Sequence, residues 1–425
     1  MTSASPDLRL AQRRQRRRFS QRRRRRLTAT LTVTAVLIGG GYSAAVGLAP
    51  LPELSPQLSV DATQTITAST KKAEAAVASQ SLPTAIGWGD GNAVWSNDDE
   101  AHPIASITKL VTVLVCLEQQ PLEPGEDGPD FVYGAAEAQR EAELRAQDAI
   151  MHPVPVGTVL TTRQVLELAL IPSSNDYAIA YAYRVFGGND AFVDAASAWA
   201  AEHGLESLSI VEPSGLSAEN RASAADLVRL GRLALQNPTV LEIVKMTSAD
   251  VPPIGRIETT NPLLGEVKGV MGLKTGSLDV AGFNLLLAQK KKFKGRSFVQ
   301  LSATLARPSR EARAASGREM LALMDGLPGR KRFVAEGEEV GSVTTWQGER
   351  VPLLTAAGAR GVLLPGESAT RSISLGAVDS GAAGRVVGSI AIEAPTEVDP
   401  VTIVTGAAIT EPDFWWRFTH PAEVL

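Results

Sequence analysis

Cysteine and histidine are scarce in this sequence, and their scarcity excludes several kinds of chemistry. The chain of 425 residues has one cysteine, Cys116, so no disulfide can form within it. Cys116 lies in an apolar helical pattern, and we interpret it as a small buried hydrophobic residue. The four histidines, His102, His152, His203 and His420, form no cluster with cysteines and carboxylates at the spacing of metal ligands. The sequence therefore indicates no metal site, and it implies no cofactor.

Charge is distributed unevenly along the chain. Residues 1–26 hold eleven arginines and one acidic residue, Asp7, whereas the rest of the chain has a net charge of about −14. A basic tail by itself is typical of segments that bind nucleic acid. Because the bulk of the chain is acidic, we expect no nucleic-acid partner.

Formal charge is absent from residues 27–50. As a helix this stretch would span roughly 36 Å, which is enough to cross a bilayer core. The arginines before it should stay in the cytoplasm, so we expect a single-pass anchor in the plasma membrane with the main domain outside. A cleaved signal peptide stays open as the alternative, because Ser43-Ala44-Ala45 has the small residues of a cleavage site; the main domain would then be secreted.

The remaining chain divides into three regions by composition. Residues 51–82 are rich in Ser, Thr, Ala and Pro and predict a linker. Residues 83–330 alternate helical and strand patterns and predict the main domain, with strands at 269–276, 282–289 and 298–305 and helices at 106–117 and 310–325. Residues 331–425 have short β-like runs between Gly and Pro, which predict a small β-rich domain.

The first chemical motif is Ser106-Ile107-Thr108-Lys109. Positions i and i+3 lie on one face of a helix, so the Ser106 hydroxyl can meet the Lys109 amine. A serine hydroxyl needs a base to become a good nucleophile, and a lysine with a lowered pKa can be that base. The helix N-terminus also offers free N–H groups to a developing oxyanion. Alone the motif is weak, because an ordinary helix cap followed by a surface lysine has the same pattern.

Two further triplets follow along the chain. Ser173-Ser174-Asn175 falls between two predicted helices, where its side chains can project into a cleft. Lys274-Thr275-Gly276 falls in an apolar strand pattern. A strand edge there can align a peptide through main-chain hydrogen bonds, with the lysine and the threonine facing a carboxylate and the glycine keeping the strand surface open. The three motifs in this order indicate a serine acyl-transfer enzyme.

With these motifs, residues 83–326 resemble the penicillin-binding serine peptidases, specifically the low-molecular-mass D-alanyl-D-alanine carboxypeptidases. Longer stretches support the resemblance: ALIPSSNDYAIAYA, VEPSGL before SAADL, TTNPLL, and GLKTGSLDVAGFNLL. The family often has glycine where Ser174 stands, and residues 118–150 lack a clear family pattern. The resemblance implies a mixed α/β (α+β) fold like that of the β-lactamases. An antiparallel sheet is covered by helices, and a cleft separates it from a mostly helical subdomain.

The resemblance assigns catalytic roles. Ser106 would attack a carbonyl and become acylated, Lys109 would accept its proton, and Ser173 would relay a proton toward the leaving group. The backbone N–H groups of Ser106 and Ser277 would form the oxyanion hole. Water would then hydrolyse the acyl-enzyme, or another amine would capture it.

Substrate-binding roles follow from the same resemblance. Asn175 would bind the substrate amide and hold Lys109. Lys274 and Thr275 would bind the terminal carboxylate of D-Ala-D-Ala, on the strand edge that also carries Gly276 and Ser277. The implied partners are peptidoglycan stem peptides as substrates and β-lactam antibiotics as covalent inhibitors.

Two other functions share these motifs. A β-lactamase uses the same triplets but typically needs a glutamate to position the deacylating water, and no such glutamate lies in a convincing loop. A non-catalytic wall-binding protein on the same fold would not need the intact set of Ser106, Lys109, Asn175 and Lys274. We therefore expect a serine D-alanyl-D-alanine carboxypeptidase, while endopeptidase and transpeptidase action stay open.

Three other features have simpler interpretations. His102 lies four residues before Ser106, ahead of the helix start, so a catalytic histidine is disfavoured. Asp176 is typical of the acidic residue at a helix N-terminus. The aromatic run at residues 414–418 is interpreted as packing the terminal strand onto the β-rich domain, with a membrane- or wall-facing patch as the alternative.

Overall fold

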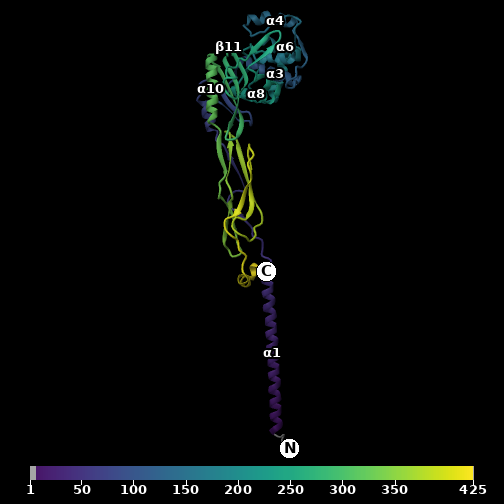
Figure 1. Cartoon of the computed structure of the whole chain (residues 1–425), viewed down its shortest axis with the longest axis vertical. Helices are drawn as coiled ribbons and strands as arrows, with labels where there is room; N and C mark the ends of the chain where they lie inside the picture. Colours follow the sequence, from purple (N-terminus) through teal and green to yellow (C-terminus); the bar gives the residue numbers. More distant parts are fainter. Residues whose placement is uncertain (1–5, 425) are drawn as a thin grey trace.

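The computed structural model describes residues 6–424, with side-chain surroundings from residue 21 onward. The first five residues of the predicted arginine-rich tail and Leu425 lie outside the described residues. Figure 1 shows a long N-terminal helix, a β-rich domain next to it, and a larger domain of helices and strands at the far end. The predicted fold class, a mixed α/β fold with an antiparallel sheet, is confirmed.

Helix α1 (Pro6–Leu48) runs without a break through the boundary that we predicted between the tail and the apolar segment. Its part from Gln21 to Leu48 is long and apolar enough to cross a membrane, and almost none of it is buried by the rest of the chain. These features fit a membrane anchor or a signal sequence near the N-terminus.

The larger domain is organised by a sheet of five antiparallel strands in the order β11-β12-β13-β3-β4. The strand bounds are Val270–Leu278 for β11, Gly282–Phe293 for β12, Arg296–Arg307 for β13, Thr84–Trp88 for β3 and Val94–Ser96 for β4. The three strands predicted in this part of the chain are confirmed, with slightly different ends. Strand β11 lies at the edge of the sheet, so one side of it can approach other groups.

Helices cover both faces of this sheet. Successive residues of a strand point to opposite faces, so neighbouring residues of one strand pack against different helices. On one face, Ile86 of β3 packs with α2 (Lys71–Ala78) and with α10 (Arg310–Asp325). On the other face, Ala85 joins the main core together with α8 (Ala224–Gln236). The helix predicted at 310–325 is confirmed as α10.

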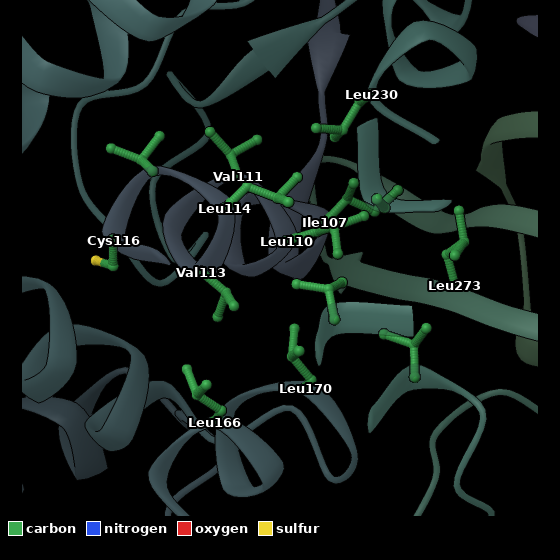
Figure 2. Close-up of a cluster of buried hydrophobic side chains, with 14 of the residues drawn as sticks. Ile107, Leu110, Val111, Val113, Leu114, Cys116, Leu166, Leu170, Leu230 and Leu273 are labelled. Atoms are coloured by element: carbon green, nitrogen blue, oxygen red, sulfur yellow. The ribbon is translucent and has the colours of Figure 1, made fainter. Parts of the chain in front are cut away.

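The helical subdomain is built around α3 (Thr108–Gln119), which passes through its core. Figure 2 shows side chains of other elements around this helix: Leu166 and Leu170 from α5 (Thr162–Leu170), Leu230 from α8, and Leu273 from β11. Cys116 is buried in the last turn of α3, and burial raises the pKa of its thiol. The interpretation of this cysteine as a small hydrophobic core residue is confirmed.

Side-chain N-caps begin helices α5 and α8. Thr161 Oγ1 accepts a hydrogen bond from the Gln164 N–H at 3.2 Å, and the Gln164 side chain accepts one from the Thr161 N–H at 2.9 Å. Ser223 Oγ accepts from the Asp226 N–H at 3.1 Å at the start of α8. Each cap satisfies backbone donors that would otherwise be unpaired at the helix start.

The remaining elements of this domain are short. The helices are α4 (Ala135–Ala146), α6 (Asn175–Phe186), α7 (Asn189–Glu202) and α9 (Pro238–Val244). Three two-stranded ribbons pair β5 (His102–Pro103) with β8 (Arg221–Ala222), β6 (Asp130–Val132) with β7 (Val159–Thr161), and β9 (Ser248–Val251) with β10 (Gly255–Glu258).

The β-rich domain contains a seven-stranded sheet in the order β1-β15-β16-β20-β19-β18-β2, beside a ribbon of β14 and β17. The bounds are Gln57–Leu58 for β1, Glu339–Thr344 for β15, Arg350–Thr355 for β16, Val401–Thr405 for β20, Val386–Glu393 for β19, Ser368–Leu375 for β18 and Thr63–Thr67 for β2. The ribbon strands are Gly329–Val334 for β14 and Ala359–Leu363 for β17. The core of this domain comes from the sheet's inward-facing apolar residues.

The segment 51–82, for which we expected a linker, instead supplies both outer strands of this sheet and helix α2. Strand β1 pairs with β15, and β2 pairs with β18. The composition did not indicate these strands because the side chains of an edge strand stay largely exposed. The run TQTIT of β2 is mostly polar and so lacks the apolar content that marks a strand.

The aromatic run near the C-terminus forms helix α11 (Phe414–Thr419) and packs on α1 rather than on a strand. The Tyr42 and Phe418 rings meet edge to face at 5.0 Å, and the Tyr42 hydroxyl donates to the Phe418 carbonyl at 2.9 Å. The Arg417 guanidinium donates to the Ala49 carbonyl at 3.0 Å. Trp415 stays 68% exposed, so part of the aromatic surface faces outward.

Candidate active site

The serine and lysine of the first motif meet as the helical spacing predicts. Ser106 lies in a short 3₁₀ turn (Ala105–Ile107), and Lys109 lies in the first turn of α3. Lys109 Nζ donates a hydrogen bond to Ser106 Oγ at 2.8 Å. Lys109 is fully buried, whereas Ser106 is partly exposed. A nucleophile that solvent can reach therefore contacts an amine that solvent cannot reach.

The surroundings of Lys109 favour its neutral form. Burial lowers the pKa of the amine to about 7, while the charges of Glu212 and Asp176 raise it. A second hydrogen bond runs from Nζ to the Ser214 carbonyl oxygen at 2.6 Å. Near neutral pH a large fraction of Lys109 is unprotonated, so the amine can accept the Ser106 proton.

Ser173 and Ser174 of the second motif lie in the turn between α5 and α6, and Asn175 begins α6. Ser173 Oγ accepts a hydrogen bond from Lys274 Nζ at 2.8 Å. Asn175 Oδ1 accepts from the Ile150 N–H at 3.0 Å. The resemblance implied that Asn175 holds Lys109, but the described residues show no direct hydrogen bond between these two side chains. The two side chains instead share an acceptor: the Ser214 carbonyl oxygen, which Lys109 contacts, also accepts a hydrogen bond from Asn175 Nδ2 at 3.4 Å.

Lys274 comes from β11 and is buried opposite the serine of the second motif. Its Nζ also donates to the Thr275 carbonyl oxygen at 3.1 Å. Burial lowers the pKa of Lys274 well below its usual range, and the positive charges of Lys109 and Arg313 lower it further. The Thr275 hydroxyl lies 2.5 Å from the Thr260 hydroxyl. Two buried lysines with lowered pKa values therefore lie near each other, one hydrogen-bonded to Ser106 and the other to Ser173.

The backbone around the nucleophile is closely packed and locally strained. Ala105 has φ of 49° and Ser173 has φ of 69°, a left-handed conformation that residues other than glycine rarely adopt. Such strain often occurs at functional sites, where the surrounding structure holds it in place. Gly276 lies against the nucleophile turn: a Cβ added to it would be 2.6 Å from the Ile104 carbonyl oxygen and 3.1 Å from the Ser106 nitrogen. The exposed Ser277 follows on the same strand.

Replacing Gly276 with alanine is expected to destabilise the domain, because the new methyl group would collide with backbone that has little room to move. We expect a loss of about 1–3 kcal/mol in the free energy of unfolding, measured by denaturant titration. Gly188→Ala is the matched control, since a Cβ there meets nothing within 4 Å and the backbone is extended. Equal stability of the two variants would contradict the close packing of β11 on the nucleophile turn.

Sequence reasoning missed Arg313 of α10. Its side chain is buried and its pKa is lowered to about 10 by burial. Its Nη2 donates to the Thr260 carbonyl at 3.4 Å, while its Nε has no hydrogen-bond partner among the described residues. A buried guanidinium near Lys274 adds positive charge at this end of the cleft. No sequence signal distinguishes it from the other arginines of α10.

His152 and Asp176 form a hydrogen-bonded cluster with Ser174 of the second motif. Asp176 accepts hydrogen bonds from Ser174 Oγ at 2.6 Å and from the His152 N–H at 3.1 Å, and His152 Nδ1 lies 2.7 Å from Ser174 Oγ. Burial raises the pKa of Asp176 and lowers that of His152. These contacts give Asp176 a structural task at the start of α6. His102 pairs with Asp98 at 3.2 Å, away from the nucleophile's hydroxyl.

A cavity of about 260 Å³ lies beside the Ser214 residue that contacts Lys109. Its walls come from α4, α6 and residues 212–217, and they include Arg140 and Tyr183. Helix α4 belongs to the part of the chain for which the sequence showed no clear family pattern. Within residues 21–424, no group of three or more His, Cys, Asp or Glu side chains is placed to hold a metal ion.

Comparison with known proteins agrees with this geometry. The peptidase S11 family, described as D-alanyl-D-alanine carboxypeptidase, matches residues 91–303, which is half of the chain. The chain is 38% identical over 143 residues to a D-alanyl-D-alanine endopeptidase of Pseudomonas aeruginosa, covering 33% of this chain and 43% of that protein. It is 27% identical over 232 residues to a D-alanyl-D-alanine carboxypeptidase of a Streptomyces species, covering 51% of this chain and 77% of that protein.

A solved structure shares the fold. Penicillin binding protein 5 from Haemophilus influenzae superposes with a TM-score of 0.54 at 18% identity, covering 78% of this chain and 97% of that chain. At this identity the likeness concerns the fold alone. The match to the Pseudomonas aeruginosa relative spans less than half of that relative's length.

Proposed function

The chain belongs to the peptidase S11 family of D-alanyl-D-alanine carboxypeptidases, and on that premise we propose that it removes the terminal D-alanine from peptidoglycan stem peptides. The reaction runs through an acyl-enzyme on Ser106. One observation carries this proposal: a partly exposed serine hydroxyl accepts a 2.8 Å hydrogen bond from a fully buried lysine amine. That pair supplies a nucleophile and its base without any histidine.

The chemical steps that we propose assign one role to each of these side chains. Ser106 Oγ attacks the carbonyl carbon of the D-Ala-D-Ala bond, and its proton passes to Lys109 Nζ. The leaving amine takes up a proton through Ser173, and D-alanine departs. Water then attacks the ester carbonyl, and Ser106 regains its proton. Backbone N–H groups of Ser106 and Ser277 would stabilise the oxyanion in both halves of the reaction.

Substrate orientation would come from β11. As an edge strand it can pair with an extended peptide through main-chain hydrogen bonds. The substrate's terminal carboxylate would lie toward the end of the cleft where Lys274, Thr275 and Arg313 gather. A carboxylate there would offset the cost of holding two basic side chains in a buried place.

Endopeptidase action on cross-linked stem peptides is the second candidate. It is favoured by the Pseudomonas aeruginosa relative, which is named an endopeptidase and is 38% identical over the matched segment. Both reactions cleave a bond after D-alanine and need the same Ser106 and Lys109. They differ only in the size of the leaving group that the cleft admits.

The test of the proposed function uses the full-length protein with two substrates. One is a synthetic stem pentapeptide ending in D-Ala-D-Ala, and the other is a cross-linked stem-peptide dimer. We expect release of free D-alanine from the first, measured by chromatography. Cleavage of the dimer alone would favour the endopeptidase, and cleavage of neither would contradict the proposal.

We also propose that α1 is an uncleaved anchor in the plasma membrane, with both folded domains outside. The packing of α11 on α1 supports this, because cleavage after Ala45 would remove Tyr42, which contacts the Phe418 ring and donates to its carbonyl oxygen. The exposed Trp415 beside the end of the span suits the membrane–water interface, where tryptophan is enriched. Mass spectrometry of the membrane-bound protein is the test: an N-terminal peptide from before residue 27 supports the anchor, and a start near residue 46 contradicts it.

A further inference from the structure

Glu212 organises the loop of residues 211–220 from within. Its Oε2 accepts hydrogen bonds from the Ser214 N–H at 2.7 Å and from the Ser214 hydroxyl at 2.6 Å. Its Oε1 accepts from the Gly215 N–H at 2.6 Å, the Ser217 N–H at 3.2 Å and Asn220 Nδ2 at 2.8 Å. None of the ion pairs among the described residues includes Glu212. Its carboxylate is therefore held by five neutral donors of its own loop.

This loop packs against α3, the helix that carries Lys109. The Pro213 carbonyl accepts from the Thr112 hydroxyl at 2.7 Å, and Asn220 Nδ2 donates to the Thr108 hydroxyl at 3.1 Å. Both threonines lie on α3, on either side of the catalytic lysine in sequence. The loop therefore contacts the helix that carries the base at two points besides the lysine itself.

Gly215 brings the loop into contact with the backbone of the nucleophile turn. It has φ of 83°, and a Cβ added to it would be 2.1 Å from the Ala105 carbonyl oxygen and 2.8 Å from the Ser106 nitrogen. The preceding residue, Ser214, is fully buried and offers its carbonyl oxygen to Lys109 Nζ at 2.6 Å. The position of that oxygen is fixed on both sides, because Glu212 binds the N–H groups of Ser214 and Gly215.

We propose that Glu212 is a positioning residue for acyl transfer: its carboxylate fixes the Ser214 carbonyl, which orients the Lys109 amine toward Ser106. This inference rests on the proposed function. Glu212 touches neither the nucleophile nor the base directly. It acts through the loop and through its negative charge, which lies near a buried amine.

The charge of Glu212 gives this role a signature that loop stability alone does not have. The charged and titratable groups that face Lys109 are Glu212 from the loop, Asp176 from α6 and Lys274 from β11; Asp176 in turn faces His152. Among these, Glu212 is the acidic group with the larger effect, and it raises the pKa of Lys109. Removing its charge should therefore lower that pKa further. Since the base acts in its neutral form, the rising limb of the pH–rate profile should then move to lower pH.

The test compares Glu212→Gln with Glu219→Gln in the full-length protein. Glu219 is an exposed glutamate of the same loop, so its replacement is a matched control. The probe is benzylpenicillin, and the readout is the second-order rate of acylation between pH 5 and pH 9, with thermal unfolding alongside. We expect Glu212→Gln to slow acylation roughly 100-fold at the plateau, the scale of a misplaced catalytic group, and to move the rising limb to lower pH. Glu219→Gln should match the wild type in both respects.

Glu212→Asp separates the effect of the negative charge from the effect of side-chain length. It keeps the negative charge but shortens the side chain, so we expect a slower plateau with the rising limb at the wild-type pH. Glu212→Asp also tests the positioning role if Glu212→Gln does not fold, because a wild-type acylation rate in Glu212→Asp would overturn the proposal. A Glu212→Gln profile with an unmoved limb would overturn it as well. Failure of the wild type to react would count against the proposed function and not against Glu212 in particular.

Discussion

The Ser106→Ala variant is expected to lose D-alanine release by roughly 10⁵-fold or more, the scale on which removal of the nucleophile disables a serine hydrolase. The reason is chemical, because the Ser106 hydroxyl is the group that would form the ester. Ser106 Oγ is the acceptor of the hydrogen bond from Lys109 Nζ, and it lies on a turn that solvent reaches. The measurement is the rate of D-alanine release from a stem pentapeptide, followed by chromatography at saturating enzyme.

Folding of the variant must be shown separately. The hydroxyl of Ser106 is small and partly exposed, so thermal unfolding should be close to that of the wild type. Ser297→Ala is the matched control, since Ser297 is an exposed serine on β13 of the same domain. Release by Ser106→Ala at a rate near that of the control would remove Ser106 from the mechanism.

The second large effect is expected from the base. Arginine at position 109 keeps the positive charge but cannot give up its proton at any accessible pH, so Lys109→Arg should slow acylation by about 10³-fold. In the wild type, burial lowers the pKa of Lys109 to about 7. Below that pH the amine is protonated and cannot accept the serine proton. The acylation rate should therefore fall about tenfold per pH unit below pH 7 and level off above it.

The measurement is the acylation rate with benzylpenicillin from pH 5 to pH 9, for the wild type, for Lys109→Arg and for the control Lys245→Arg. Lys245→Arg serves as the control because Lys245 is an exposed lysine at the end of α9. It should keep the wild-type rate and the wild-type pH profile. A flat wild-type profile over this range would mean that Lys109 is not the titrating base.

The fold was most predictable where local pattern and burial agree. The strands β11, β12 and β13 each contain a run of consecutive buried residues because both faces of the sheet are covered by helices, and their ends were placed within a few residues. Helix α10 begins after a capping serine and lies where it was predicted, near residues 310–325. The meeting of Ser106 with Lys109 was predictable as well, because an i, i+3 spacing on a helix fixes it locally.

Long-range contacts were not predictable in the same way. Nothing in the sequence shows that Ser214, over a hundred residues beyond Lys109, offers it a carbonyl oxygen, or that Asn175 reaches the lysine through that same oxygen. Glu212 and Arg313 are ordinary charged residues until the fold brings them near Lys109 and Lys274. The outer strands of the β-rich domain were missed for a related reason, since pairing with strands about 283 to 309 residues away defines them.

The most direct test of the account is the intact mass of the full-length protein during incubation with benzylpenicillin. A long-lived adduct of one whole penicillin molecule should form on the wild type and be absent from Ser106→Ala. The result that would contradict it is a protein of unchanged mass at every time point while the penicillin in solution stays intact.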